Sequence, residues 1–218
     1  MLVTKDKVNY FIIFIISLIL VLDLFLHKGA PATFDGNTHM TAMAQFSLAL
    51  KSGDFPVLWA PNFANYGLPI ALIAHQIPNY LGAIISFFIH DFVLVFNLLM
   101  FFAVLLAGAF FYRFLRLYFS EAVALLGTIV FTFAPYKIIN IYIRGALPEM
   151  IASIFVPLIL INIHTFIKTK SIGSISRLVL FFTLLVLTHP FLFVIELFII
   201  VPYFIFELLQ SSSAGKDR

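Results

Sequence analysis

Apolar segments long enough to cross a lipid bilayer recur along almost the whole chain, and short charged groups separate them. A helix of about 20 apolar residues spans the hydrocarbon core. Hydrophobic residues make up 62% of the chain and charged residues 11%, against about 45–50% and about 25% in soluble domains. Because a backbone in lipid must satisfy its own hydrogen bonds, apolar runs of this length predict helices. The sequence therefore predicts an all-α polytopic membrane protein.

The predicted topology has six transmembrane helices, at residues 8–27, 92–112, 121–136, 149–167, 178–188 and 191–208. Segment 69–90 is ambiguous, because its cleanly apolar part covers only about ten residues, too few to cross. If 69–90 does not cross, nine of the 13 lysines and arginines lie on the inner face, and Lys28, Lys51, Lys137 and Arg144 on the outer one. If it crosses, only four of these residues lie on the inner face and nine on the outer one, which contradicts the positive-inside rule. We therefore predict a re-entrant or interfacial segment at the outer face.

This topology implies one transmembrane module over residues 1–208, with an outer loop at 28–91 and a polar tail at 209–218. Both termini are then cytoplasmic, and the protein is a multi-pass plasma-membrane protein. An alternative for the first span is a cleaved signal peptide, because Ala30-Pro31-Ala32 has the form of a cleavage site. Lysines and arginines cluster only beside the spans, so the sequence gives no support for nucleic-acid binding.

The longest stretch that cannot lie in lipid runs from 34 to 69, inside the outer loop. Asp35, Asn37 or Thr38 can cap a helix there, and Gly53 can end it. Between them, Met40, Met43 and Phe46 recur at helical spacing. We expect a short amphipathic helix in the plane of the membrane interface.

Ionisable side chains that do not flank the inner face gather at the outer face in this topology. A charge at the centre of a membrane helix costs about 2.5–3.5 kcal/mol, so such groups usually have a function. The set consists of Asp35, His39, His75, Arg144, Glu149 and His189.

Asp35 and His39 are four residues apart and share a helix face. A carboxylate and an imidazole can act as a general base or bind a metal ion. We therefore name them as catalytic candidates and as candidate ligands of a divalent cation such as Mg or Mn. The alternative is that Asp35 only caps the helix and His39 is a surface residue.

The other candidates are assigned to substrate binding. Arg144 can bind a phosphate through its planar guanidinium group, with Glu149 positioning a partner, or the two can simply form an ion pair. His189, before Pro190, can bind substrate or merely end a helix. His75 and Tyr142 complete the set, with a place in the interfacial aromatic belt as the alternative for Tyr142.

Short motifs occur in a characteristic order along the chain. They read D-G-x-x-H, G-D-F-P-x-x-W-x-P, Y-G-x-P, I-P-N-Y-L-G, A-P-Y, Y-x-R-G-A-x-x-E-x-x-A and T-H-P. In this order they resemble the bacterial integral-membrane family called, misleadingly, 6-pyruvoyl-tetrahydropterin synthase-related. That family in turn resembles the GT-C superfamily of glycosyltransferases, which use polyprenyl-phosphate sugars.

The resemblance implies that this chain is the N-terminal module of a GT-C-like enzyme. Such an enzyme would transfer a sugar from a polyprenyl-phosphate donor to an acceptor hydroxyl at the outer face of the cell envelope. Asp35 matches the acidic residue that serves these enzymes as catalytic base or metal ligand. The region of Arg144 and Glu149 matches the loop that binds the donor phosphate or the metal.

Two other functions stay open from the sequence. The chain can be a non-catalytic or truncated membrane subunit that binds a lipid-linked glycan and works with a second membrane subunit. It can also be a small transporter, whose path would use the intramembrane carboxylates Asp23 and Glu196. Our interpretation of these two carboxylates is instead that they are hydrogen-bonded between helices.

Overall fold

The computed structural model describes residues 2–60, 62–69 and 75–214. Within these ranges the regular secondary structure is helical, and one isolated antiparallel bridge joins Ala60 to Leu68. The predicted all-helical fold is thereby confirmed.

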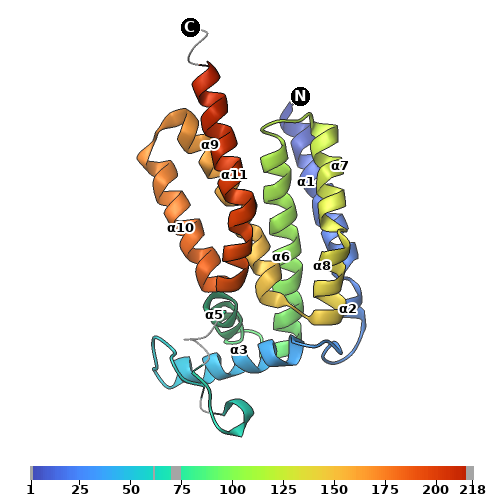
Figure 1. Ribbon diagram of the computed structural model, residues 1–218. Coiled ribbons are helices and arrows are strands. Elements are labelled where there is room, and N and C mark those ends of the chain that lie inside the picture. Colours follow the sequence, from blue (N-terminus) through green and yellow to red (C-terminus); the bar gives the residue numbers. More distant parts are fainter. Residues whose placement is uncertain (1, 61, 70–74, 215–218) are drawn as a thin grey trace.

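Six helices run along a common axis, and each is antiparallel to the next along the chain (Figure 1). The described ends of the chain lie at the same end of this bundle, which we call the terminal end; the other is the loop end. The six are α1 (Leu2–Val21), α6 (Phe92–Leu115), α7 (Glu121–Thr132), α9 (Leu147–Thr169), α10 (Ile172–Thr188) and α11 (Pro190–Ala214).

Four helical stretches are long and apolar enough to cross a membrane: Phe92–Leu115, Glu121–Arg144, Leu147–Thr169 and Pro190–Ser212. They correspond to four of the six predicted spans. Two shorter apolar helices, Lys7–Val21 and Ile172–Thr188, correspond to the other two. The first and fifth crossings therefore stay predictions.

Several helix ends differ from those predicted. The span predicted at 178–188 begins earlier, at Ile172, because the Ser171 side chain accepts a hydrogen bond from the Ser174 amide and caps α10. The span predicted at 121–136 continues beyond α7 through α8 (Pro135–Ile139) and a π-helical turn (Asn140–Arg144). Helix α11 extends to Ala214, into the predicted polar tail, and residues 215–218 lie outside the described residues.

The core is built around α9, whose buried side chains contact α6, α10 and α11. Leu147 and Ile159 are fully buried, and Met150 nearly so. Leu147 and Met150 lie in the first turn of this helix. The start of α9 is thus held firmly against the rest of the bundle.

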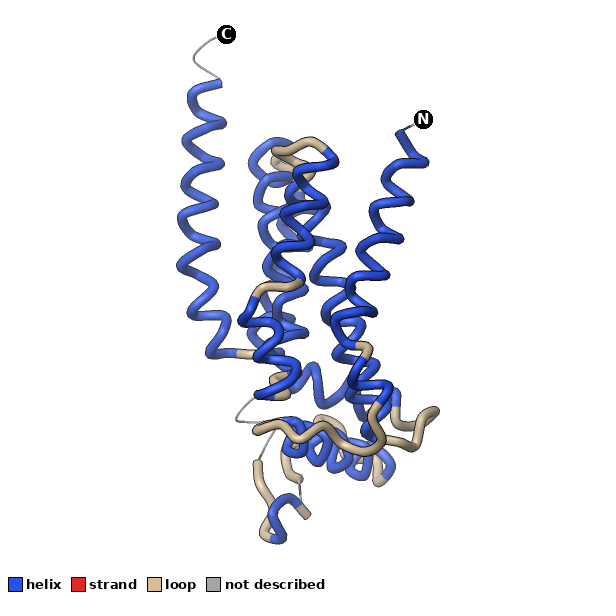
Figure 2. Tube along the Cα trace, turned by 90° about the vertical axis from the view of Figure 1, so that its right-hand side faces the viewer, coloured by secondary structure: helices blue, strands red, loops and turns tan. Residues whose placement is uncertain are grey.

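Two short helices lie across the loop end: α3 (Gly36–Lys51) and α5 (Gln76–Ile85) (Figures 1 and 2). They touch closely at Gly82, where a Cβ atom would lie 1.9 Å from Met43 Sδ. Helix α3 forms where the amphipathic helix was predicted, and it buries Met40, Met43 and Phe46. Helix α5 lies within 69–90 and runs across the bundle, as a segment that does not cross the membrane would; residues 70–74 lie outside the described residues.

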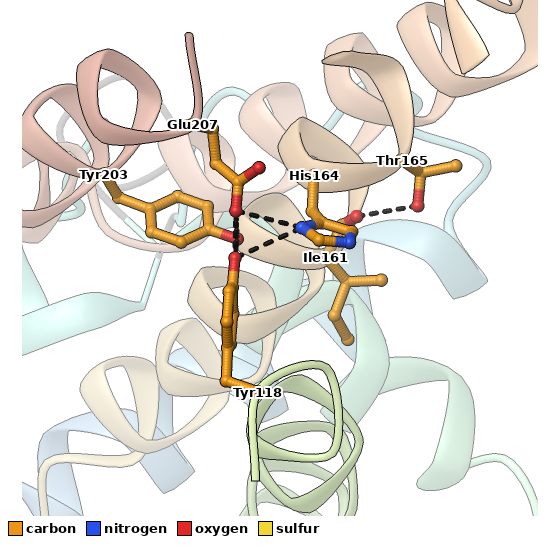
Figure 3. A network of polar contacts seen from close by, with 6 residues as sticks. All are labelled: Tyr118, Ile161, His164, Thr165, Tyr203 and Glu207. Carbon is orange, nitrogen blue, oxygen red and sulfur yellow. Dashed lines mark hydrogen bonds and ion pairs between the residues drawn. The ribbon is translucent and has the colours of Figure 1, made fainter. Parts of the chain in front are cut away.

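A buried polar network that the sequence did not reveal joins three segments at the terminal end (Figure 3). The Glu207 carboxylate on α11 is 2% exposed, and its Oε1 lies 2.9 Å from His164 Nδ1 on α9. The hydroxyl groups of Tyr203 and of Tyr118, which follows α6, donate to the same oxygen. Because leaving a buried carboxylate unpaired is costly, this network fixes α11 against α9.

At the loop end, the segment leading into α3 packs backbone to backbone against the turn that precedes α9. The Phe34 amide donates to the Ile143 carbonyl (3.1 Å), and the Asp35 amide donates to the Arg144 carbonyl (2.7 Å). Gly145 has φ +67°, and a Cβ atom there would lie 2.4 Å from Thr33 Oγ1 and 2.9 Å from the Gly36 nitrogen. Only glycine meets both requirements, the left-handed backbone and the close approach.

We expect Gly145→Ala to destabilise the protein more than Gly29→Ala does. Both positions have positive φ, so alanine costs about 1–3 kcal/mol of backbone strain at either. Gly29 has open space within 4 Å of a built Cβ, whereas Gly145 would clash with Thr33 and Gly36. The thermal unfolding midpoint in detergent should fall further for Gly145→Ala. Equal midpoints for the two variants would contradict the backbone packing described here.

Candidate functional site

A cavity of about 260 Å³ opens at the loop end of the bundle. Six of the seven residues predicted for the site line it: Asp35, His39, His75, Arg144, Glu149 and His189. They come from segments far apart in the sequence. Asp35 and His39 lie at the start of α3, and Glu149 in the first turn of α9, while His189 joins α10 to α11.

Glu149 is the centre of the hydrogen bonding in this cavity. Its Oε1 lies 2.6 Å from a terminal nitrogen of Arg144. Its Oε2 accepts from Asn140 Nδ2 (3.1 Å) and from the Tyr136 hydroxyl, while Asn140 Oδ1 accepts from Arg144 (2.9 Å). The ion pair considered from the sequence is therefore present, and it holds the Arg144 guanidinium in a fixed position.

Sequence reasoning did not assign Tyr136 and Asn140 to the site. Their spacing was a usable signal, because Tyr136, Asn140 and Arg144 are each four residues apart and so share one helical face.

Asp35 occupies the N-cap position of α3, but its side chain makes no capping hydrogen bond. The interpretation of Asp35 as a helix cap alone is therefore not supported. The Gly36 amide instead donates to Thr33 Oγ1 (3.2 Å). The Asp35 carboxylate lines the cavity.

Three histidines stand in a row along the cavity. Ring centroids are 5.7 Å apart for His39 and His75, and 4.8 Å apart for His75 and His189. His75 Nδ1 donates to the Thr188 carbonyl (3.0 Å), so it carries the ring proton. His189 Nδ1 accepts from the Leu192 amide (3.0 Å), which places its proton on Nε2, 3.9 Å from Glu149 Oε1.

The three imidazoles are neutral at pH 7. Burial, and after it the neighbouring His75 and His189, lower the pKa of His39 to about 3. Burial is also the main cause that lowers the pKa of His75 and of His189. The carboxylates and Arg144 therefore carry the charge in this cavity, and the histidines contribute neutral hydrogen-bonding groups.

Within the described ranges, no three histidine or acidic side chains are arranged to hold a metal ion. Asp35 and His39, the predicted ligands, are only two. The divalent cation considered from the sequence therefore stays a prediction, and we derive no step through one.

Tyr142, the seventh predicted residue, lies outside the cavity. Its hydroxyl donates to the Leu20 carbonyl (2.5 Å), and the residue lines a separate cavity of about 320 Å³ with Asp23 and Lys28. Asp23 pairs with His27 (3.0 Å), one helical turn away. Among the residues that the structure describes, Glu196 Oε2 is buried and has no hydrogen-bond partner, so the inter-helix hydrogen bond expected of Glu196 is not found at this oxygen.

We expect acid to destabilise the protein through His39. Its folded-state pKa lies below the unfolded value of 6.5, so protons bind the unfolded state first and stability falls as the pH drops below about 6.5. A single such group costs about 1.4 kcal/mol per pH unit over this interval. The melting temperature in detergent, measured from pH 7.5 to pH 4.5, should fall less steeply for His39→Gln than for wild type. The exposed His90→Gln serves as the control and should keep the wild-type slope.

Comparison with known proteins supports the membrane assignment. The model of the family described as the 6-pyruvoyl-tetrahydropterin synthase related domain, a membrane protein family, matches residues 76–216. The match includes Arg144, Glu149 and His189, and Asp35, His39 and His75 precede it. No curated protein and no solved structure matches the chain. The chain belongs to the 6-pyruvoyl-tetrahydropterin synthase related family of membrane proteins.

Proposed function

We propose that this protein is a GT-C-like membrane glycosyltransferase module that transfers a sugar from a polyprenyl-phosphate donor to an acceptor hydroxyl. One observation carries the proposal. A carboxylate without a capping role, a fixed guanidinium and three neutral imidazoles meet in one cavity, at the end of the bundle away from the termini. Such a set can remove a proton, hold a phosphate and hydrogen-bond a sugar in one place.

In the proposed reaction, the Asp35 carboxylate accepts the proton of the acceptor hydroxyl. The acceptor oxygen forms a bond to the anomeric carbon of the sugar while the bond from that carbon to the phosphate oxygen breaks. The bonding electrons leave with the polyprenyl phosphate. Arg144, positioned by Glu149 and Asn140, stabilises the charge that develops on the phosphate.

The histidines contribute orientation in this proposal. As neutral imidazoles they can donate and accept hydrogen bonds without repelling Arg144. His39 stands one helical turn from Asp35 and assists it, while His75 and His189 bind sugar hydroxyls. Their fixed tautomers leave His75 Nε2 as an acceptor and His189 Nε2 as a donor.

We further propose that all six axial helices cross the plasma membrane, with both termini in the cytoplasm. The shared terminal end agrees with an even number of crossings (Figure 1), and the distribution of lysines and arginines supports this orientation. The cavity then faces outward, where a lipid-linked sugar and an acceptor of the cell envelope can reach it.

A second candidate is a non-catalytic subunit that binds a lipid-linked glycan for a partner membrane protein. The close Arg144–Glu149 pair favours it, because the strongest charges of the cavity already neutralise one another without a substrate. The glycosyltransferase requires the Asp35 carboxylate as a base, whereas the non-catalytic subunit does not.

We expect Asp35→Asn to lower sugar transfer about 10²–10⁴-fold, because a general base contributes rate of that order. The assay measures transfer from radiolabelled polyprenyl-phosphate sugars in proteoliposomes. Asp54→Asn, an exposed position in the same outer loop, is the control and should retain activity. Transfer by Asp35→Asn at the wild-type rate would remove the catalytic role. Absence of transfer in wild type, combined with weaker glycolipid binding by Arg144→Ala, would favour the subunit.

The orientation can be tested by labelling, because the chain contains no cysteine. We expect Asp54→Cys at the loop end to react with a membrane-impermeant maleimide in intact cells. Thr169→Cys at the terminal end should react only after the membrane is opened. Both positions are exposed, so access to the reagent decides the outcome. The reverse pattern would contradict the proposed orientation.

A further inference from the structure

A second cavity, of about 430 Å³, lies toward the terminal end of the bundle, between α6, α9 and α10. It is separate from the cavity at Asp35, and the proposed function makes no use of it. Most of its wall is hydrocarbon, contributed among others by Phe110, Leu158 and Phe181. Two arginines, Arg113 on α6 and Arg177 on α10, also line it.

Neither arginine has a carboxylate partner within 4 Å among the described residues, unlike Arg116 at the same end, which lies 3.6 Å from Glu121. Two uncompensated guanidinium groups on one cavity attract an anion. Arginine is suited to phosphate, because its planar N–H groups can bind two oxygens at once.

Arg177 is positioned by a buried partner. Its Nε donates to Asn162 Oδ1 (2.7 Å), and Asn162 is only 5% exposed. The Asn162 side chain is fixed in turn, since its Nδ2 donates to the Leu158 carbonyl (2.8 Å). This arrangement engages Nε and leaves the terminal nitrogens of Arg177 to bind a ligand.

The surroundings indicate that the anion belongs to a lipid. Beside the two arginines, the cavity is lined by the apolar side chains of Phe110, Leu158, Ile161 and Phe181. A ligand held by the arginines therefore also contacts the apolar side chains of the cavity wall. Basic pockets between membrane helices on the cytoplasmic side are suited to anionic lipid headgroups.

We propose that this cavity binds an anionic phospholipid, with Arg113 and Arg177 holding the headgroup phosphate and the apolar wall holding part of an acyl chain. Asn162 is a positioning residue that orients Arg177. The bound lipid would bridge α6 and α10 across α9.

The test is binding of phosphatidylglycerol to the delipidated full chain in detergent, followed by native mass spectrometry. We expect Arg113→Gln/Arg177→Gln to raise the dissociation constant at least tenfold. Arg116→Gln, which removes a paired arginine from the same end, should change it less than twofold. Phosphatidylcholine, which carries no net charge, should bind wild type and the double variant equally weakly.

Equal phosphatidylglycerol affinity in wild type and the double variant would overturn the proposal. So would full competition by millimolar inorganic phosphate, since this would identify the site as one for free phosphate. If the double variant does not fold, Arg113→Gln alone decides the question. Arg113 is exposed, and no hydrogen bond depends on its side chain among the contacts of the described residues, so this variant should fold and bind phosphatidylglycerol at least threefold more weakly.

Discussion

The close packing of two backbone segments at the loop end is the constraint on which the rest of the site depends. The loop before α3 is joined to the turn before α9 by two amide-to-carbonyl hydrogen bonds, and Gly145 faces Thr33 and Gly36 without room for a side chain. This packing joins the segment before α3 to the central helix of the bundle. Asp35 and Arg144 lie together because their own backbones are hydrogen-bonded.

Glu149 organises the polar side chains beside this backbone contact. It stands in the first turn of α9, the helix that the core holds most firmly, and it gathers Arg144, Asn140 and Tyr136 around one carboxylate. Because α9 is packed on several sides, the carboxylate cannot move away from its partners without disturbing the core. The core thus fixes the side of the site that contains Arg144 and Glu149.

The two ends of the bundle place their charges differently. At the loop end, burial keeps three histidines neutral beside two carboxylates and one arginine, an arrangement suited to handling a polar substrate. At the terminal end, Glu207 and His164 are buried and hydrogen-bonded with two tyrosine hydroxyls (Figure 3). Arg113 and Arg177 line an apolar cavity there and have no carboxylate partner in the described part of the chain. The network around Glu207 holds helices together, and the cavity at Arg113 and Arg177 is available to a ligand.

The sequence alone determined the helical class, the membrane setting and the side of the molecule on which six candidate residues gather. It could do so because the length of an apolar run and the positions of basic residues can be read directly from the sequence. Both depend on how the chain passes through a membrane. Tertiary structure decided what these properties cannot encode. Tyr136 and Asn140 belong to the site although the sequence did not predict them, and Tyr142 lies outside it although the sequence did. The π-helical turn sets which of these side chains face Glu149. The Glu207 network and the Arg113–Arg177 cavity arise from contacts between helices distant in sequence, which no local pattern specifies.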